Sequence, residues 1–228
     1  MKKRMILVLM MQVFLFTCLY AQSTEKVLQY RDYIAQTVNK RLTVKGLELK
    51  PGLQMKDALK HFKSNGFKLE EEFRKIAPNE YLLIGEFMGR QNVKIYLIPT
   101  NKNKDVLGIV GVAFPMVNTF KKLNEDYSLL KSSLSEKYWL SESEESFKSL
   151  LVDESSSDVM KLYALGHGEA NFQSRFQVTN DEGALMMGYI VLEISHIKSD
   201  QLSQCYVSIS YHTSDNVVEQ LTEGNDDL

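Results

Sequence analysis

The sequence predicts an α+β fold, an antiparallel sheet of two meander halves with helices packed on one face. Two clusters of strand-like runs, rich in β-branched and aromatic residues, lie at residues 81–115 and 170–213. The turns within each cluster are too short for crossover helices, so neighbouring runs are expected to pair antiparallel. An amphipathic segment at 117–138 separates the two clusters and would supply a helix to cover the sheet.

The chain begins with the features of a secretory signal peptide. Three cations at positions 2–4 precede an apolar run from Met5 to Leu19. This run is shorter than the roughly 20 residues that a membrane-spanning helix needs, which disfavours an uncleaved anchor. A small residue, Ala21, then precedes a polar stretch. We therefore predict a signal peptide over residues 1–21 and export to the periplasm or the extracellular space.

Cys18 offers a second interpretation, because a bacterial lipoprotein carries its acyl chains on a cysteine at the cleavage site. Lipid attachment favours small residues directly before that cysteine, and Phe16 and Thr17 fit poorly. An acyl chain contributes about 0.8 kcal/mol of membrane affinity per buried CH₂, so lipidation would decide whether the protein is anchored. We predict cleavage after Ala21 as the main outcome, and membrane association only if Cys18 is lipidated.

The first half of the chain opens with helical and turn signals. Residues 22–41 are expected to form an N-terminal helix or linker, because apolar residues recur at helical spacing over 25–40. Residues 41–49 alternate like a strand that is interrupted at Gly46. An amphipathic pattern follows over 53–66 and ends in Asn-Gly, which is typical of a helix C-terminus.

The first meander consists of runs at 81–88, 92–99 and 105–115, with 67–76 as a candidate fourth strand. After the helix predicted over 117–138, the serine- and glutamate-rich stretch 141–158 is interpreted as polar connections around a short helical or irregular piece at 147–151.

The second cluster has strand-like runs at 170–178, 183–197 and 203–213, followed by a short helical pattern at 215–221. Because no linker rich in proline or glycine interrupts the chain, we predict a single domain. Its expected boundaries are 42–222, with similar halves at 42–116 and 117–213 and an acidic tail at 223–228.

Two stretches of this chain carry a resemblance to a known group. The succession LTVKGLELKPG (42–52), FKSNGF (62–67) and YLLIGEFMGRQNVKIYLIP (81–99), together with the run at 161–195, resembles a group of uncharacterised exported bacterial proteins. The resemblance spans roughly residues 42–212 and implies a fold like that of the β-lactamase inhibitor protein, two tandem repeats of helix plus antiparallel sheet. It implies no catalytic residues, and fold analogy alone does not imply inhibition of an enzyme.

Composition limits the partners. The whole sequence has a net charge of −2, and removal of the leader takes away three cations and no acid. An acidic mature chain argues against nucleic acid as a partner, because phosphate binding needs a basic face. The mature chain would retain one cysteine, Cys205, which rules out an internal disulfide. Cys205 shares the apolar alternation of its strand, as expected of a small buried residue rather than a nucleophile.

No pattern predicts a catalytic, metal or cofactor site. If 183–197 and 203–213 form a hairpin that turns near residue 200, His196 pairs near residue 203 and His212 near residue 187. The two histidines then lie roughly 30 Å apart and cannot share a metal. Adjacent acids at 70–72 would alternate between the faces of a strand and therefore could not form a facing catalytic pair. We expect no metal, no cofactor and no catalytic residue.

The best functional lead is a candidate interaction surface on one face of the second sheet half. Tyr206 and His212 occupy the polar side of their strand, and Arg175 and Gln177 lie on a predicted neighbouring strand. Tyrosine is favoured at interfaces because it offers large area at small entropy cost. An ordinary solvated sheet face explains the same pattern.

We therefore favour an exported, non-catalytic binding module that acts on another envelope or extracellular protein through the sheet face or its loops. Two alternatives stay open: a hydrolase whose site is assembled only in the fold, and a carrier of an apolar small molecule between sheet and helices. An exposed concave sheet lined by Tyr and Arg favours the binding module. Converging acids and histidines favour the hydrolase, and an apolar cavity favours the carrier.

Overall fold

The computed structural model describes residues 41–148, 152–179, 186–197 and 204–223. The predicted signal peptide with Cys18, the helix expected over 25–40 and the acidic tail beyond residue 223 lie outside these residues. In chain order the first half contains β1 (Thr43–Val44), β2 (Leu47–Glu48), α2 (Met55–Ser64), β3 (Lys68–Leu69), α3 (Phe73–Ile76), β4 (Tyr81–Phe87), β5 (Arg90–Pro99) and β6 (Leu107–Ala113). The second half contains α4 (Phe120–Ser135), β7 (Trp139–Phe147), α5 (Asp158–Gly166), β8 (Ala170–Thr179), β9 (Met186–Ile197), β10 (Gln204–Thr213) and α6 (Ser214–Glu223).

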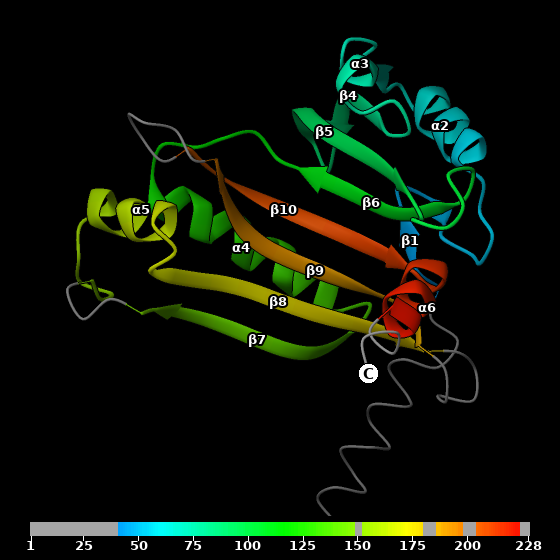
Figure 1. The fold of residues 1–228 in the computed structure, drawn as a ribbon. Coiled ribbons are helices and arrows are strands. Elements are labelled where there is room, and N and C mark those ends of the chain that lie inside the picture. Colours follow the sequence, from blue (N-terminus) through cyan, green and yellow to red (C-terminus); the bar gives the residue numbers. More distant parts are fainter. Residues whose placement is uncertain (1–40, 149–151, 180–185, 198–203, 224–228) are drawn as a thin grey trace, which may run out of the picture.

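One eight-stranded antiparallel sheet dominates the fold, in the order β3-β4-β5-β6-β10-β9-β8-β7 (Figure 1). Each half contributes a four-stranded meander, and the last strands of the two halves, β6 and β10, join the meanders at the centre. Their register places Tyr211 opposite Val110 and His212 opposite Ile109. The predicted α+β class with two antiparallel meanders is confirmed.

The helices α2 and α4 cover one face of the sheet. The helix predicted over 117–138 is confirmed as α4, which begins after Thr119, whose side chain accepts a hydrogen bond from the Lys122 amide. From α4, Leu123 and Tyr127 are fully buried, and Phe62 of α2 is buried in the same continuous core. None of the helices within the described residues is long and apolar enough to cross a bilayer.

A buried ion pair connects the two halves on this covered face. The Arg90 guanidinium donates two hydrogen bonds to the Asp126 carboxylate, and Lys122 pairs with the same group. Burial alone would raise the pKa of Asp126, but the hydrogen bonds from Arg90 and Lys122 outweigh it and lower that pKa. Strand β5 of the first half is thereby fixed to helix α4 of the second.

The polar stretch 141–158, expected to consist of connections, is largely regular structure. Its first part belongs to β7, which among the described strands pairs only with β8 and forms one edge of the sheet. An edge strand is largely solvated, so serine and glutamate can fill positions that are apolar in a central strand. The helix α5 then begins after Ser157, whose side chain caps the Met160 amide.

Two further expectations in the first half need correction. Residues 42–49 do not form an interrupted strand but a tight hairpin of β1 and β2, with Lys45 and Gly46 at its turn at φ +49° and +80°. Two consecutive positive φ values are the mark of a two-residue hairpin turn. The candidate strand at 67–76 is limited to β3, and the short helix α3 takes up its end.

Candidate binding face of the second half

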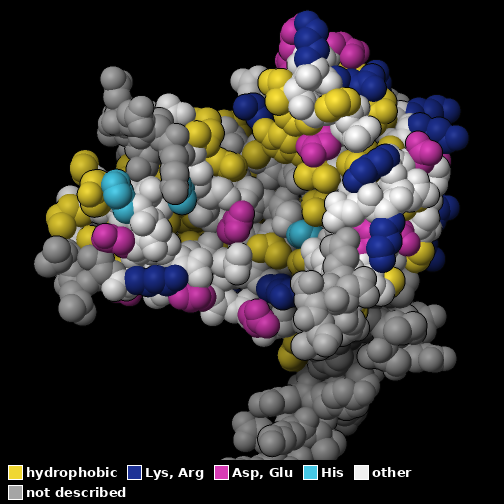
Figure 2. Space-filling view, in the orientation of Figure 1, with side chains coloured by type: hydrophobic (Ala, Val, Ile, Leu, Met, Phe, Trp, Pro, Cys, Tyr) yellow, Lys and Arg dark blue, Asp and Glu magenta, His cyan; other side chains and the backbone are white. Residues whose placement is uncertain are grey.

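Alternation along β8, β9 and β10 divides their side chains between the covered face and a second face, which we call the open face. In β10, Cys205, Val207, Ile209 and Tyr211 are buried, whereas the residues between them are half-buried. The cross-strand register aligns the open-face residues. They are Arg175 and Gln177 on β8, Tyr189, Val191, Glu193 and Ser195 on β9, and Tyr206, Ser208, Ser210 and His212 on β10. Figure 2 shows this side of the molecule hollowed, with cationic, acidic and histidine side chains around the hollow.

Three side chains of the open face form a continuous stack across three strands. The Arg175 guanidinium lies over the Tyr189 ring at 4.1 Å from the ring centroid. On the neighbouring strand, the His212 ring is parallel to Tyr189 within 12°, with centroids 4.2 Å apart. A cation over an aromatic ring is worth about 0.5–2 kcal/mol and fixes the orientation of a flexible arginine. The stack therefore preorganises Arg175.

Hydrogen bonds hold the His212 ring from both sides. The Asn216 amide donates to Nδ1 at 3.0 Å, so the ring proton lies on Nε2, which is 3.0 Å from the Ser210 hydroxyl. Burial, and secondarily the charge of Arg175, lower the pKa of His212 to about 4. His212 is therefore neutral near pH 7 and acts as a rigid support for Tyr189.

The helix α6 fixes the end of the stack. Tyr189 donates its hydroxyl hydrogen to Gln220 at 3.1 Å, and Asn216 of the same helix holds His212. The Glu219 carboxylate anchors α6 to the loop between β5 and β6, where it accepts from the Asn101 and Lys102 amides, both at 2.8 Å. The stack is thus supported by a helix that is itself tied to the first half.

Arg175 has no hydrogen-bond partner for its own cation among the described residues. Its Nε atom is buried and unsatisfied, and its guanidinium makes no ion pair or hydrogen bond with any residue in the described ranges. Glu142 lies directly opposite Arg175 on β7 but forms no ion pair with it. Glu193, on the next strand, accepts from Ser195 at 2.9 Å and from Gln173 at 3.3 Å. A preorganised, half-buried cation without a carboxylate is the main chemical feature of this face, as far as the structure describes it.

The structure groups the predicted surface residues unevenly. Arg175 and His212 meet in the stack, and Gln177 lies directly opposite Tyr189 on the adjacent strand. Tyr206 is farther along β10, opposite Ser195, where it adds to the effect of burial in raising the pKa of Tyr96. The sequence reasoning missed Tyr189, which joins the predicted residues. The predicted hairpin register paired His212 near residue 187, and the observed partner is residue 189.

The open face also contains a serine and a histidine in contact, a pair that occurs in hydrolases. A general base must accept the serine proton, but Nε2 of His212 carries a proton of its own because Asn216 donates to the other nitrogen. A pKa of about 4 makes the same imidazole a weak base. This geometry supports a structural role for the Ser210–His212 pair.

The cysteine that the sequence singled out, Cys205, is in a structural setting. Cys205 is fully buried, and burial raises the pKa of its thiol to about 11, as expected for a core residue. Within the described ranges, no three His, Cys, Asp or Glu side chains gather to hold a metal ion.

Comparisons with protein-family models, with curated proteins and with solved structures find no match. The resemblance to exported bacterial proteins therefore stays a prediction.

Proposed function

We propose that this chain is an exported, non-catalytic binding module whose open face binds another envelope or extracellular protein. The observation that carries this proposal is Arg175, a cation held in place by Tyr189 and left without a carboxylate among the described residues. A carboxylate of the partner would complete the ion pair. Gln177 would add an amide contact near this ion pair, and Tyr206 would add a phenol contact farther along the open face.

The rigidity of the site favours binding. Ordering a flexible side chain at an interface costs about 0.5–1.5 kcal/mol, and the stack avoids much of that cost for Arg175. Arginine and tyrosine are also enriched among the residues that dominate interface energies. A hollowed, half-polar face with one preorganised cation suits an acidic segment of a folded or extended partner.

Site-specific photocrosslinking in the source organism tests where the partner binds. A benzophenone amino acid at Gln177 is expected to give a discrete adduct after irradiation of intact cells, and the adduct is identified by mass spectrometry. The matched control carries the same group at Lys121, an exposed residue of α4 on the covered side. Equal adducts at both positions, or none at Gln177, would contradict binding at the open face.

A pair of arginine variants tests the chemistry. Arg175→Gln is expected to weaken binding of the crosslinked partner at least tenfold, because a hot-spot arginine contributes about 2 kcal/mol. Arg74→Gln is the control, because Arg74 also lies over a tyrosine, Tyr81, at 5.1 Å, but on helix α3 of the first half. If both variants bind the partner as the unchanged chain does, Arg175 is not the contact.

A further inference from the structure

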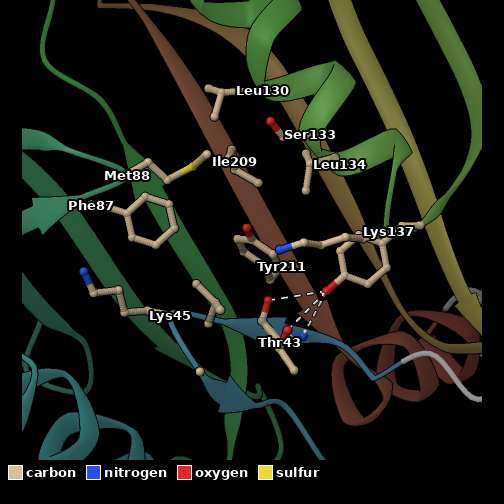
Figure 3. Close-up of a pocket in the computed structure, with 13 residues that line it drawn as sticks. Thr43, Lys45, Phe87, Met88, Leu130, Ser133, Leu134, Lys137, Ile209 and Tyr211 are labelled. Carbon is tan, nitrogen blue, oxygen red and sulfur yellow. Dashed lines mark hydrogen bonds between the residues drawn. The ribbon is translucent and has the colours of Figure 1, made fainter.

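A second cavity lies on the covered face, at the junction of four segments that are distant in the sequence. The β1–β2 hairpin, the turn between β4 and β5, helix α4 with the residues after it, and strand β10 enclose a pocket of about 260 Å³. Figure 3 shows Lys137 extending inward from the side of α4, whereas Lys45 lies at the hairpin side with its amine pointing outward. We call this cavity the lysine pocket. It lies on the opposite side of the sheet from the open face and is independent of the function proposed above.

The wall of the lysine pocket is apolar on one side. Phe87 comes from the end of β4, Met88 from the turn after it, Leu130 and Leu134 from α4, and Ile209 from β10. Of these, Phe87, Leu130, Leu134 and Ile209 are buried hydrophobic residues of the core. This wall can hold an apolar chain but offers it no hydrogen bonds.

The charge in the lysine pocket has one sign. Its lining includes two lysines and no aspartate or glutamate among the described residues. Lys45 donates to the Glu86 carbonyl at 3.2 Å, and that acceptor leaves its positive charge unneutralised. Lys137 forms no ion pair with any residue that the structure describes. In a chain with a net charge of −2, a cationic pocket without acids points to an anionic ligand.

A hydroxyl on a buried ring supplies a second, independent sign of a ligand. The Tyr211 side chain is only 5% exposed, yet its hydroxyl makes no hydrogen bond with any described residue. Figure 3 shows this hydroxyl facing the cavity, which both Tyr211 and Lys137 line. The neighbouring Tyr138 differs, because its hydroxyl accepts from the Thr43 amide at 3.2 Å. The Tyr211 hydroxyl is therefore a donor at the cavity that a ligand could use.

We propose that the lysine pocket binds a medium-chain carboxylate. The carboxylate would accept from Lys137 and from the Tyr211 hydroxyl, and the alkyl chain would lie against Phe87, Leu134 and Ile209. A volume of about 260 Å³ holds about nine water-sized groups, which is near the size of octanoate and small for a longer lipid. One ammonium and one hydroxyl donor also match the two oxygens of a carboxylate better than the three of a sulfate or phosphate.

Calorimetric titration of the purified chain with octanoate tests this proposal. Saturable binding is expected, with at least tenfold weaker binding of octan-1-ol, which has the same chain and no charge. The absence of saturable octanoate binding overturns the proposal. Binding of octanol as tight as that of octanoate overturns the anionic class, and tighter binding of octyl sulfate overturns the choice of carboxylate.

Two variants test the residues. Lys137→Gln and Tyr211→Phe are each expected to weaken octanoate binding at least tenfold. Lys121→Gln, which removes an exposed lysine of α4 that is absent from the pocket lining, is expected to leave it within twofold. Far-UV circular dichroism and the thermal midpoint show whether each variant is folded. Unchanged affinity in a folded Lys137→Gln or Tyr211→Phe variant overturns the assignment of that residue.

Discussion

The open face and the lysine pocket lie on opposite faces of one sheet and meet on strand β10. Tyr211 faces the pocket, and His212, the next residue, faces the stack. Both ring nitrogens of His212 have hydrogen-bond partners, whereas the Tyr211 hydroxyl has none among the described residues. The two adjacent polar groups therefore have different roles. The hydrogen-bonded His212 supports its neighbours, and the Tyr211 hydroxyl is available to a ligand.

The same distinction applies within the open face. Tyr189 is hydrogen-bonded to Gln220, and His212 to Asn216 and Ser210. Arg175, which Tyr189 and His212 support, is the group without an ion-pair partner in the described ranges. In a site of this kind a few atoms contact the partner and supply the binding energy, and neighbouring residues hold those atoms in position. Substitutions in the supporting residues should therefore change stability, and substitutions at Arg175 should change binding.

The largest effect is expected at Gly188, where β9 pairs with the end of β10 and with β8. A side chain there would collide with the His212 carbonyl oxygen and come within 2.8 Å of Leu42, and the glycine has φ +136°. Gly188→Ala should lower the free energy of unfolding by about 3 kcal/mol or more, because strain and a backbone clash add. Gly111→Ala in β6 is the control, because its new methyl group would approach Tyr96 only to 3.4 Å. Equal losses in urea denaturation of the two variants would refute this assignment.

Titration of His212 gives the next largest effect. Its pKa is about 4 in the folded chain, against 6.5 for an unperturbed histidine, so the unfolded chain binds more protons between these values. The contribution of neutral His212 is complete above pH 6.5 and is lost as the pH falls, reaching a loss of about 3 kcal/mol at pH 4.

Urea denaturation of the unchanged chain and of His212→Phe, at pH 7 and at pH 4, isolates this contribution. The lowered pKa values of Asp126 and Glu219 also reduce stability in acid, but they do so in both proteins and cancel in the difference. The unchanged chain should therefore lose about 3 kcal/mol more than the variant. A parallel decline of both proteins would mean that the fold does not lower the pKa of His212.

The sequence was informative where alternation is regular and uninformative where distant segments converge. The apolar and polar sides of 203–213 followed from residues such as Cys205 and Tyr206, and this pattern placed His212 correctly. Tyr189 was missed because a two-residue change of hairpin register depends on the turn, which the pattern does not determine. Edge strand β7 was missed because solvation permits a serine- and glutamate-rich strand.

The lysine pocket was beyond such reasoning. Lys45, Met88, Lys137 and Tyr211 belong to four separate segments, and each is unremarkable in its own stretch. The sequence raised a carrier of an apolar small molecule as an alternative, but it contained no sign of a cationic pocket. Only the pairing of β6 with β10 and the packing of α4 bring these residues together.

The smallest expected change in the free energy of unfolding is that of Tyr211→Phe. It is informative in comparison with His212→Phe, because the two residues are adjacent in β10 and face opposite sides of the sheet. His212→Phe keeps a ring against Tyr189 but leaves Ser210 and Asn216 without their partner, which should cost about 2 kcal/mol. Tyr211→Phe removes a hydroxyl that bonds to no described residue, so its effect should lie within about 0.5 kcal/mol. Urea denaturation at pH 7 measures both. A cost of about 2 kcal/mol for Tyr211→Phe would mean that the hydroxyl already has a partner in the protein, and the two faces would then not differ in the way proposed.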